Sequence, residues 1–285
     1  MNHALINIYT QLRAFFGPLH GPDAAQPWWP LFGENAAFEI VLGAVLVQQT
    51  RWEAVEGAIE RLFANGYRTP ADFATAQVEE LIALLRPVAF PTQKAVGLVA
   101  IAQHFVAYYK GDVLTLLARS TMELRSELLA LPRIGRETAD VIMLYASGHA
   151  IFVVDEYTRR LGERVAPEAL PWRAPYDTLR IAIEGELART DNDHAPLYAD
   201  FHAQINEVCV RFCLSKPRCD GPPARRVYSH QPGRNAYLDR HDGCPLRAVC
   251  AFYQKELSIG ALTAIQPKRL STVLLFDPWE ERRDG

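Results

Sequence analysis

Apolar residues recur at intervals of three and four along most of the chain, which is the spacing of one face of an α-helix. Residues 1–16 show this pattern and end at Gly17-Pro18, a pair that stops a helix. Residues 36–47 are apolar on nearly every side, which predicts a buried helix. Because no convincing strand series is present, the sequence predicts an all-α fold with short loops. Further helices are predicted at about 51–64, 70–76, 77–85, 92–109, 121–130, 136–147, 156–165, 173–188 and 193–213.

Length and composition narrow the class of protein. The 285 residues, 49% of them hydrophobic, can bury a large core in one large or two modest domains. We expect no membrane span, no signal peptide and a cytoplasmic location, because neither a long apolar run nor a basic segment leading into one is present. The net charge of −3 argues against a general nucleic-acid binder. In residues 206–250, however, basic residues outnumber acidic ones, so any DNA contact must be local.

A turn between two predicted helices is the stretch around which the chain is organised. Pro132 and Gly135 interrupt the helical pattern, and a new helix opens at about Arg136. Backbone N–H groups in such a turn, together with the positive end of the following helix, bind a phosphate without any particular side chain. We expect that phosphate to belong to DNA. The predicted anchor consists of Arg133, Ile134, Gly135 and Arg136.

This turn, followed by Phe152-Val153-Val154-Asp155, resembles the signature of a known family. It is similar to the helix-hairpin-helix and Gly/Pro-Asp motif of the endonuclease III superfamily of base-excision DNA glycosylases. The resemblance places Asp155 at the catalytic aspartate and Gln48 at the residue that enters the duplex and fills the gap left by an extruded base. It covers about residues 30–250 and implies a monomer that binds double-stranded DNA containing a damaged base.

Within this superfamily the chain looks closest to the endonuclease III-like 3-methyladenine glycosylases. It shares with them a Trp-Trp-Pro segment, a Gln-x-Thr-x-aromatic turn and a glutamate beside the hairpin. An extruded base is read by stacking in an aromatic slot, and a cationic alkylated purine gains a further attraction to an electron-rich indole. Trp28, Trp29 and Trp52 are the candidates for this slot, although each could instead pack in the core.

Two carboxylates are the candidates for the chemistry. Cleavage of an N-glycosidic bond builds positive charge on the sugar, which Asp155 can stabilise; the alternative is a helix N-cap aspartate. In family members that also nick the strand, a lysine forms a Schiff base at the position of Glu137. Because a glutamate has no amine, water is the expected nucleophile. Glu137 could contact the base or position this water, or be only a first-turn helix charge.

The hairpin departs from the family pattern at one residue. The family usually shows Leu-Pro-Gly-x-Gly, whereas Arg133 stands here at the first glycine. If that position requires a positive φ, an arginine is strained there. Either the turn is altered, or Arg133 adds a cation next to the phosphate.

Four cysteines are candidates for a metal centre, namely Cys213, Cys219, Cys244 and Cys250. The segments around them resemble the 4Fe-4S loop of the family, in which the middle two cysteines are two residues apart; here residues 222–243 are inserted between them. A zinc ion held by four cysteines is the alternative. Lys216 and Arg218 could face DNA phosphates, as could four arginines of the insertion, unless that insertion is a solvated loop. These four are Arg225, Arg226, Arg234 and Arg240.

Together these features predict a two-domain helix-hairpin-helix glycosylase fold with an iron–sulfur cluster loop. Residues 36–149 would form a six-helix module, and residues 1–35 with 150–250 a second helical domain. Residues 251–285 would form a weakly ordered or peripheral tail. The leading hypothesis is a monofunctional glycosylase for alkylated bases. The alternatives are an oxidised-pyrimidine glycosylase with lyase activity and a non-catalytic DNA-binding iron–sulfur protein.

Overall fold

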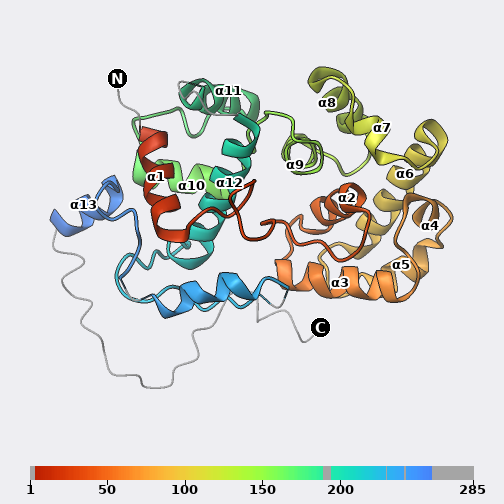
Figure 1. Ribbon diagram of the computed structural model, residues 1–285, viewed down its shortest axis with the longest axis horizontal. Coiled ribbons are helices and arrows are strands. Elements are labelled where there is room, and N and C mark those ends of the chain that lie inside the picture. The colour runs from red at the N-terminus through yellow and green to blue at the C-terminus, as the bar shows by residue number, and fades with distance from the viewer. Residues whose placement is uncertain (1–3, 189–193, 229, 241, 259–285) are drawn as a thin grey trace.

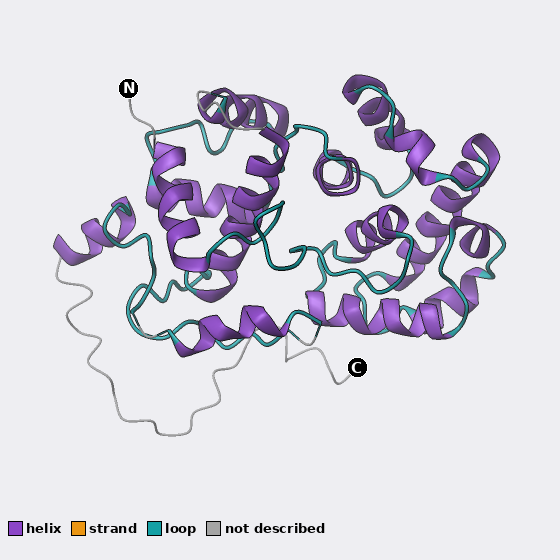
Figure 2. Cartoon of the chain, viewed as in Figure 1, coloured by secondary structure: helices purple, strands orange, loops and turns teal. Residues whose placement is uncertain are grey.

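The computed structural model describes residues 4–188, 194–228, 230–240 and 242–258. Every regular element in these ranges is helical, which confirms the predicted all-α class (Figure 1, Figure 2). None of the described helices is both long enough and apolar enough to cross a membrane. In chain order the helices are α1 (Ala4–Phe16), α2 (Ala36–Leu46), α3 (Trp52–Ala64), α4 (Pro70–Ala74), α5 (Val78–Leu84), α6 (Pro91–Tyr109), α7 (Val113–Leu117), α8 (Thr121–Ala130), α9 (Arg136–Ser147), α10 (Glu156–Val165), α11 (Tyr176–Leu187), α12 (His194–Arg211), the 3-10 helix η1 (Pro232–Asp239) and α13 (Ala251–Ser258).

The helices pack as two groups that meet where α9 contacts α12 (Figure 1). One group runs from α2 to α9, and the other contains α1 and α10 to α13. Helix α2 is buried from Ala37 to Leu46, as predicted, and packs against α9. The helix that follows the hairpin is therefore fixed to the most apolar helix of the first group and also contacts the second. The proposed division into residues 36–149 and residues 1–35 plus 150–250 stays a prediction.

Local sequence signals set the ends of the helices around the hairpin. The Ser120 hydroxyl accepts from the Glu123 backbone N–H and so caps α8. Gly148 ends α9 at φ 67°, a left-handed conformation in which glycine carries no side-chain penalty. Asp155 caps α10. The turn at residues 131–135 therefore lies directly before α9, and Asp155 lies at the end of the loop that follows α9.

Three short elements were not predicted from the sequence. Helix α7 has five residues, which is too short for a periodic apolar pattern to stand out. The 3-10 helix η1 lies inside the insertion, and α13 begins the predicted tail. None of the residues of α13 is buried, and it contacts α10 from the outside. The rest of the predicted tail, residues 259–285, lies outside the described residues.

The insertion 222–243 is partly packed into the protein: the alternative of a solvated loop is wrong at Arg234, which is buried, whereas Arg225 and Arg240 are exposed. The Arg234 guanidinium is buried and its Nε donates to Glu207 Oε2 at 3.1 Å. Gln231 is buried as well and its Nε2 donates to the Trp28 carbonyl at 2.9 Å. Arg226 pairs with Glu53 of α3 at 3.3 Å. The expectation that Arg234 faces a phosphate is therefore wrong, because Glu207 holds its charge inside.

Glu207 should be essential for stability, because the buried guanidinium groups of both Arg211 and Arg234 pair with it. We expect Glu207→Gln to lower the free energy of unfolding in urea by about 3–5 kcal/mol, the usual cost of leaving a buried charge without its partner. The matched control is Glu60→Gln, which removes an exposed pair with His230 and should cost about 1 kcal/mol or less. Equal effects of the two substitutions would contradict this account of the insertion.

Candidate active site

Asp155 stands at the start of α10, after four buried residues, Ile151 to Val154. Its Oδ1 accepts from the backbone N–H of Thr158 at 2.7 Å and from the Thr158 hydroxyl at 2.8 Å. Its Oδ2 accepts from Asn206 Nδ2 at 3.1 Å and lies 3.5 Å from His202 Nε2. One carboxylate oxygen thus caps the helix while the other faces α12. The two interpretations of Asp155, a helix cap and a functional carboxylate, are compatible.

The surroundings of Asp155 favour its ionised form. Burial alone would raise the pKa of this carboxyl, but His202 and the Thr158 donors outweigh it and lower the pKa below the ordinary value. The Asp155 side chain is only 13% exposed, so as a carboxylate that remains ionised it can stabilise positive charge that develops next to it, because little water screens the interaction.

Glu137 lies in the first turn of α9, directly after the hairpin. Its side chain reaches solvent, yet the protein around it partly desolvates it. This desolvation, together with repulsion from Asp155 and Glu156, raises the pKa of Glu137 to about 7, against a smaller opposing effect of Arg159. A first-turn helix charge alone would not raise the pKa of Glu137 in this way.

The three candidate tryptophans form a continuous aromatic cluster with Tyr145. The Trp29 ring lies 6.2 Å from that of Trp28, 5.3 Å from that of Trp52 and 5.7 Å from that of Tyr145. Trp29 is only 6% exposed and packs on Gly43 of α2, where a Cβ would come within 2.9 Å of its ring. Trp28 and Trp52 are partly exposed. Trp29 is thus the buried member of the cluster, and Trp28 and Trp52 expose ring surface that a ligand can contact.

The turn between α2 and α3 is tied to the hairpin. Gln48 Nε2 donates to the Arg133 carbonyl at 2.8 Å and to the Thr138 hydroxyl at 3.0 Å, and its Oε1 accepts from Arg133 Nη2 at 3.2 Å. The neighbouring Gln49 is exposed and has φ 53°. Gln48 therefore connects this turn to the hairpin, and Gln49 projects from its tip, a residue that the sequence pattern did not single out.

Lys94 of α6 supports the same turn from inside. It is 0% exposed, and its Nζ donates to the carbonyls of Leu46 and Gln48 and to the Thr50 hydroxyl at 2.6–2.9 Å. Burial and the nearby charge of Arg133 lower the pKa of Lys94 to about 8. A lysine on the buried side of an otherwise apolar helix is the sequence signal that could have identified it.

The hairpin keeps the backbone geometry that a glycine would adopt. Arg133 has φ 66°, so the turn is not altered at this residue and the arginine bears the left-handed conformation. Its side chain lies on Gly97 of α6, where a Cβ would come within 2.5 Å of it. Ile134 is buried, and Gly135 starts α9 without a side-chain cap. Arg136 pairs with Asp177 of α11 at 3.0 Å.

The four predicted metal-ligating cysteines come together at the end of α12 and the loops that follow it. The Cys244 N–H donates to the Cys219 carbonyl at 2.8 Å, and Arg164 Nη1 donates to Cys213 Sγ at 3.3 Å. Burial raises the pKa of Cys219 to about 11 and that of Cys244 to about 12, and repulsion from the other thiols adds to both. Within the described residues, however, no three metal-binding side chains are grouped tightly enough to hold a single ion.

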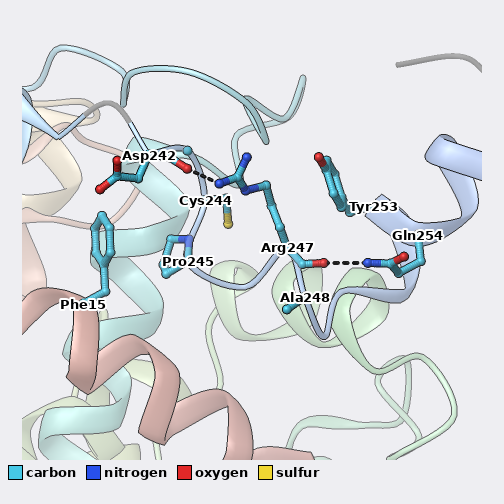
Figure 3. A pocket seen from close by; sticks show the side chains of 9 residues that line it. Phe15, Asp242, Cys244, Pro245, Arg247, Ala248, Tyr253 and Gln254 are labelled. Atoms are coloured by element: carbon cyan, nitrogen blue, oxygen red, sulfur yellow. Dashed lines mark hydrogen bonds between the residues drawn. The ribbon is translucent and has the colours of Figure 1, made fainter. Parts of the chain in front are cut away.

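An open cavity of about 430 Å³ lies beside this loop (Figure 3). Phe15 of α1, Arg247 and Tyr253 line it together with Cys244. Arg247 Nη1 pairs with Asp220 at 2.9 Å, which draws the two ends of the cysteine loop together. Cys244 is the one cysteine of the four that lines this cavity. The cavity is therefore not a space that all four thiols share.

The carboxylates of Asp155 and Glu137 should titrate in a coupled way. We expect a ¹³C NMR titration of the Glu137 carboxyl to show a midpoint near pH 7. Asp155→Asn removes a neighbouring negative charge and should move that midpoint toward acid pH. A midpoint that is already ordinary in the unchanged protein, or one that does not move in the variant, would contradict this geometry.

Comparisons with known proteins agree with this fold. The model of the HhH-GPD superfamily of base excision DNA repair proteins matches residues 42–169. The chain is 33% identical to a candidate DNA repair glycosylase of Methanocaldococcus jannaschii over 222 residues, which is 78% of this chain and 94% of that relative. Two solved structures share the fold. A trapped endonuclease III–DNA covalent intermediate has a TM-score of 0.65, with 22% identity over 90% of this chain and 99% of the other. The 3-methyladenine DNA glycosylase of H. pylori bound to 1,N6-ethenoadenine has a TM-score of 0.55, with 24% identity over 71% of this chain and 95% of the other. The chain therefore belongs to the HhH-GPD superfamily of base excision DNA repair proteins.

Proposed function

We propose that this protein is a monofunctional DNA glycosylase that hydrolyses the N-glycosidic bond of alkylated bases in double-stranded DNA and leaves an abasic site. One observation carries the proposal: the Asp155 carboxylate is held by Thr158, Asn206 and His202 at the start of α10 and repels Glu137 beside the hairpin, so that the pKa is lowered for Asp155 and raised for Glu137. Carboxyls whose pKa values are pushed apart divide the roles of ionised stabiliser and proton carrier in glycoside hydrolysis.

The DNA-facing elements fit an extruded base. In this proposal the hairpin and the start of α9 hold a backbone phosphate, and the turn at Gln48 and Gln49 fills the gap in the duplex. The exposed Lys216 and Arg218 contact further phosphates. The extruded base stacks against Trp28 and Trp52, which is sequence-tolerant because every base offers an aromatic face.

The reaction then follows from charge. As the bond between the sugar and the base breaks, the bonding electrons leave with the base and positive charge develops on the sugar. The ionised Asp155 stabilises this charge, and water attacks the sugar carbon. Glu137, which exchanges a proton near neutral pH, hydrogen-bonds the leaving base or takes the proton released by the water.

The environment disfavours the lyase alternative. A Schiff base needs an accessible amine, and Glu137 occupies the position next to the hairpin where the family's lysine stands. Lys94 lies beside the turn between α2 and α3, but its amine is buried and donates to three acceptors. Neither group offers a free amine for a Schiff base, so water is the nucleophile in this proposal.

An alkylated base suits the aromatic cluster. Alkylation at a ring nitrogen gives a purine positive charge, and indole faces attract cations. A 3-methyladenine DNA glycosylase of H. pylori that shares this fold was solved with 1,N6-ethenoadenine, so the fold itself can accommodate a modified adenine.

Base release from methylated duplex DNA tests the proposal. We expect Asp155→Asn to lower the single-turnover rate about 10²–10³-fold, the usual loss when one preorganised electrostatic group is removed from a transition state. Asp112→Asn is the matched control, since it changes an exposed aspartate cap on α7 and should not alter the rate. Borohydride should trap no covalent adduct on an abasic duplex. A trapped adduct, or full activity of Asp155→Asn, would sink the proposal.

We further propose that the four gathered cysteines hold a 4Fe-4S cluster. The donor set fits, because a cluster takes one thiolate for each of four irons and does not require all four sulfurs at a single ion. Arg164, which donates to Cys213 Sγ, stabilises a thiolate there. The cluster would serve as a structural crosslink between α12, α13 and the exposed cations of the loop.

Iron analysis of the purified protein tests the cluster. We expect about four irons per chain, a brown colour and their loss in Cys219→Ser. Cys209→Ser is the control, because Cys209 of α12 neighbours Cys213 but is not one of the four cysteines. Zinc in place of iron after anaerobic purification would contradict the cluster.

A further inference from the structure

A buried chain of polar side chains leads from α9 through α12 to Asp155. The Tyr145 hydroxyl donates to the Ala199 carbonyl at 3.0 Å and lies 2.7 Å from His202 Nδ1. The other ring nitrogen of His202, Nε2, lies 3.5 Å from Asp155 Oδ2. Tyr145 is 8% exposed and His202 is 4% exposed, so water supplies little of their hydrogen bonding. Neither residue belongs to a sequence motif.

The contacts on both sides of the His202 ring define how it can serve Asp155. The Tyr145 hydroxyl reaches Nδ1, and because a hydroxyl can both donate and accept, it holds this nitrogen in place. Nε2 is then the ring nitrogen that faces Asp155 Oδ2, toward which an Nε2 proton would point. Asn206 Nδ2 lies within hydrogen-bonding distance of Asp155 Oδ2, of the His202 carbonyl and of Nε2.

We propose that His202 is the buried hydrogen-bond donor and positioning residue of Asp155, and that Tyr145 holds its ring in place. The inference rests on the proposed function, since it explains how the carboxylate of that site stays ionised. A buried charge without a partner neutralises itself by taking up or losing a proton. When DNA covers the site and excludes water, His202 supplies the partner that water no longer can.

The same side chains also support the wall of the slot. The Trp28 ring lies 5.8 Å from the His202 ring and 5.8 Å from the Tyr145 ring. The nearby Asp200 is a second buried carboxylate, but it accepts from Tyr9 and from the backbone of Leu19 and His20. Asp200 is therefore held by its own donors, and Asp155 is the carboxylate to which His202 points. His202 and Tyr145 thus support both the Trp28 ring and the Asp155 carboxylate.

Three variants separate this role from simple packing. We expect His202→Leu to lower the single-turnover rate of base release about 10²-fold, because a carboxylate displaced by about 1 Å loses that much. His202→Gln should recover most of this loss, since its amide can donate to Asp155. Tyr145→Phe keeps the ring contacts and should lower the rate about 10-fold without changing the affinity for the duplex, within the usual range for losing one hydrogen bond. Tyr198→Phe, another buried tyrosine, is the control and should not change the rate.

Nitrogen NMR of histidine-labelled protein gives a readout independent of activity. The Nε2 nitrogen of His202 should carry the proton that faces Asp155, and Asp155→Asn should shift its resonance. An unprotonated Nε2 in the unchanged protein would overturn the inference, as would His202→Leu with the rate of the unchanged protein. If Asp155→Asn itself retains base release, or if the unchanged protein releases none, the proposed function fails, and the NMR result still decides the pairing of His202 with Asp155.

Discussion

The site depends on keeping one carboxylate charged in a buried position. Asp155 can remain ionised only because α9, α10 and α12 meet there, with α10 providing the cap donors of Thr158 and α12 providing His202 and Asn206. The contact between α9 and α12 is also the one that joins the two groups of helices. The helix contact that joins the two groups is thus close to the residues that surround the Asp155 carboxylate.

A second constraint unites the elements that would face DNA. Gln48 hydrogen-bonds to Arg133 and Thr138, and Lys94 of α6 donates a hydrogen bond to the Gln48 carbonyl. The turn between α2 and α3 and the hairpin therefore form one unit. Arg133 accepts a left-handed conformation within this unit, and its side chain lies on Gly97. A duplex bound by the hairpin would consequently contact the turn between α2 and α3 at a fixed distance from the bound phosphate. The insertion adds a third tie, because Gln231 holds the backbone of Trp28.

Most of the fold could be predicted from periodicity because the long helices each bury one apolar face. The short α7 and η1 were not predicted, although α4 and α5, which are of similar length, were. The sequence indicated the proposed site only where a local motif marks it, as at Asp155 and Glu137. His202 and Tyr145 escaped because the sequence does not show which partner a polar side chain will face in the fold. Arg234 misled for the same reason: its partner, Glu207, lies on a distant helix.

The most direct test of the central claim measures released base and broken strands in the same reaction on methylated duplex DNA. The account predicts that free alkylated base accumulates while the strands stay intact, and that breaks appear only after alkali treatment of the abasic product. Strand breaks that accumulate in step with base release would contradict a water nucleophile at Asp155 and Glu137 and would favour a lyase.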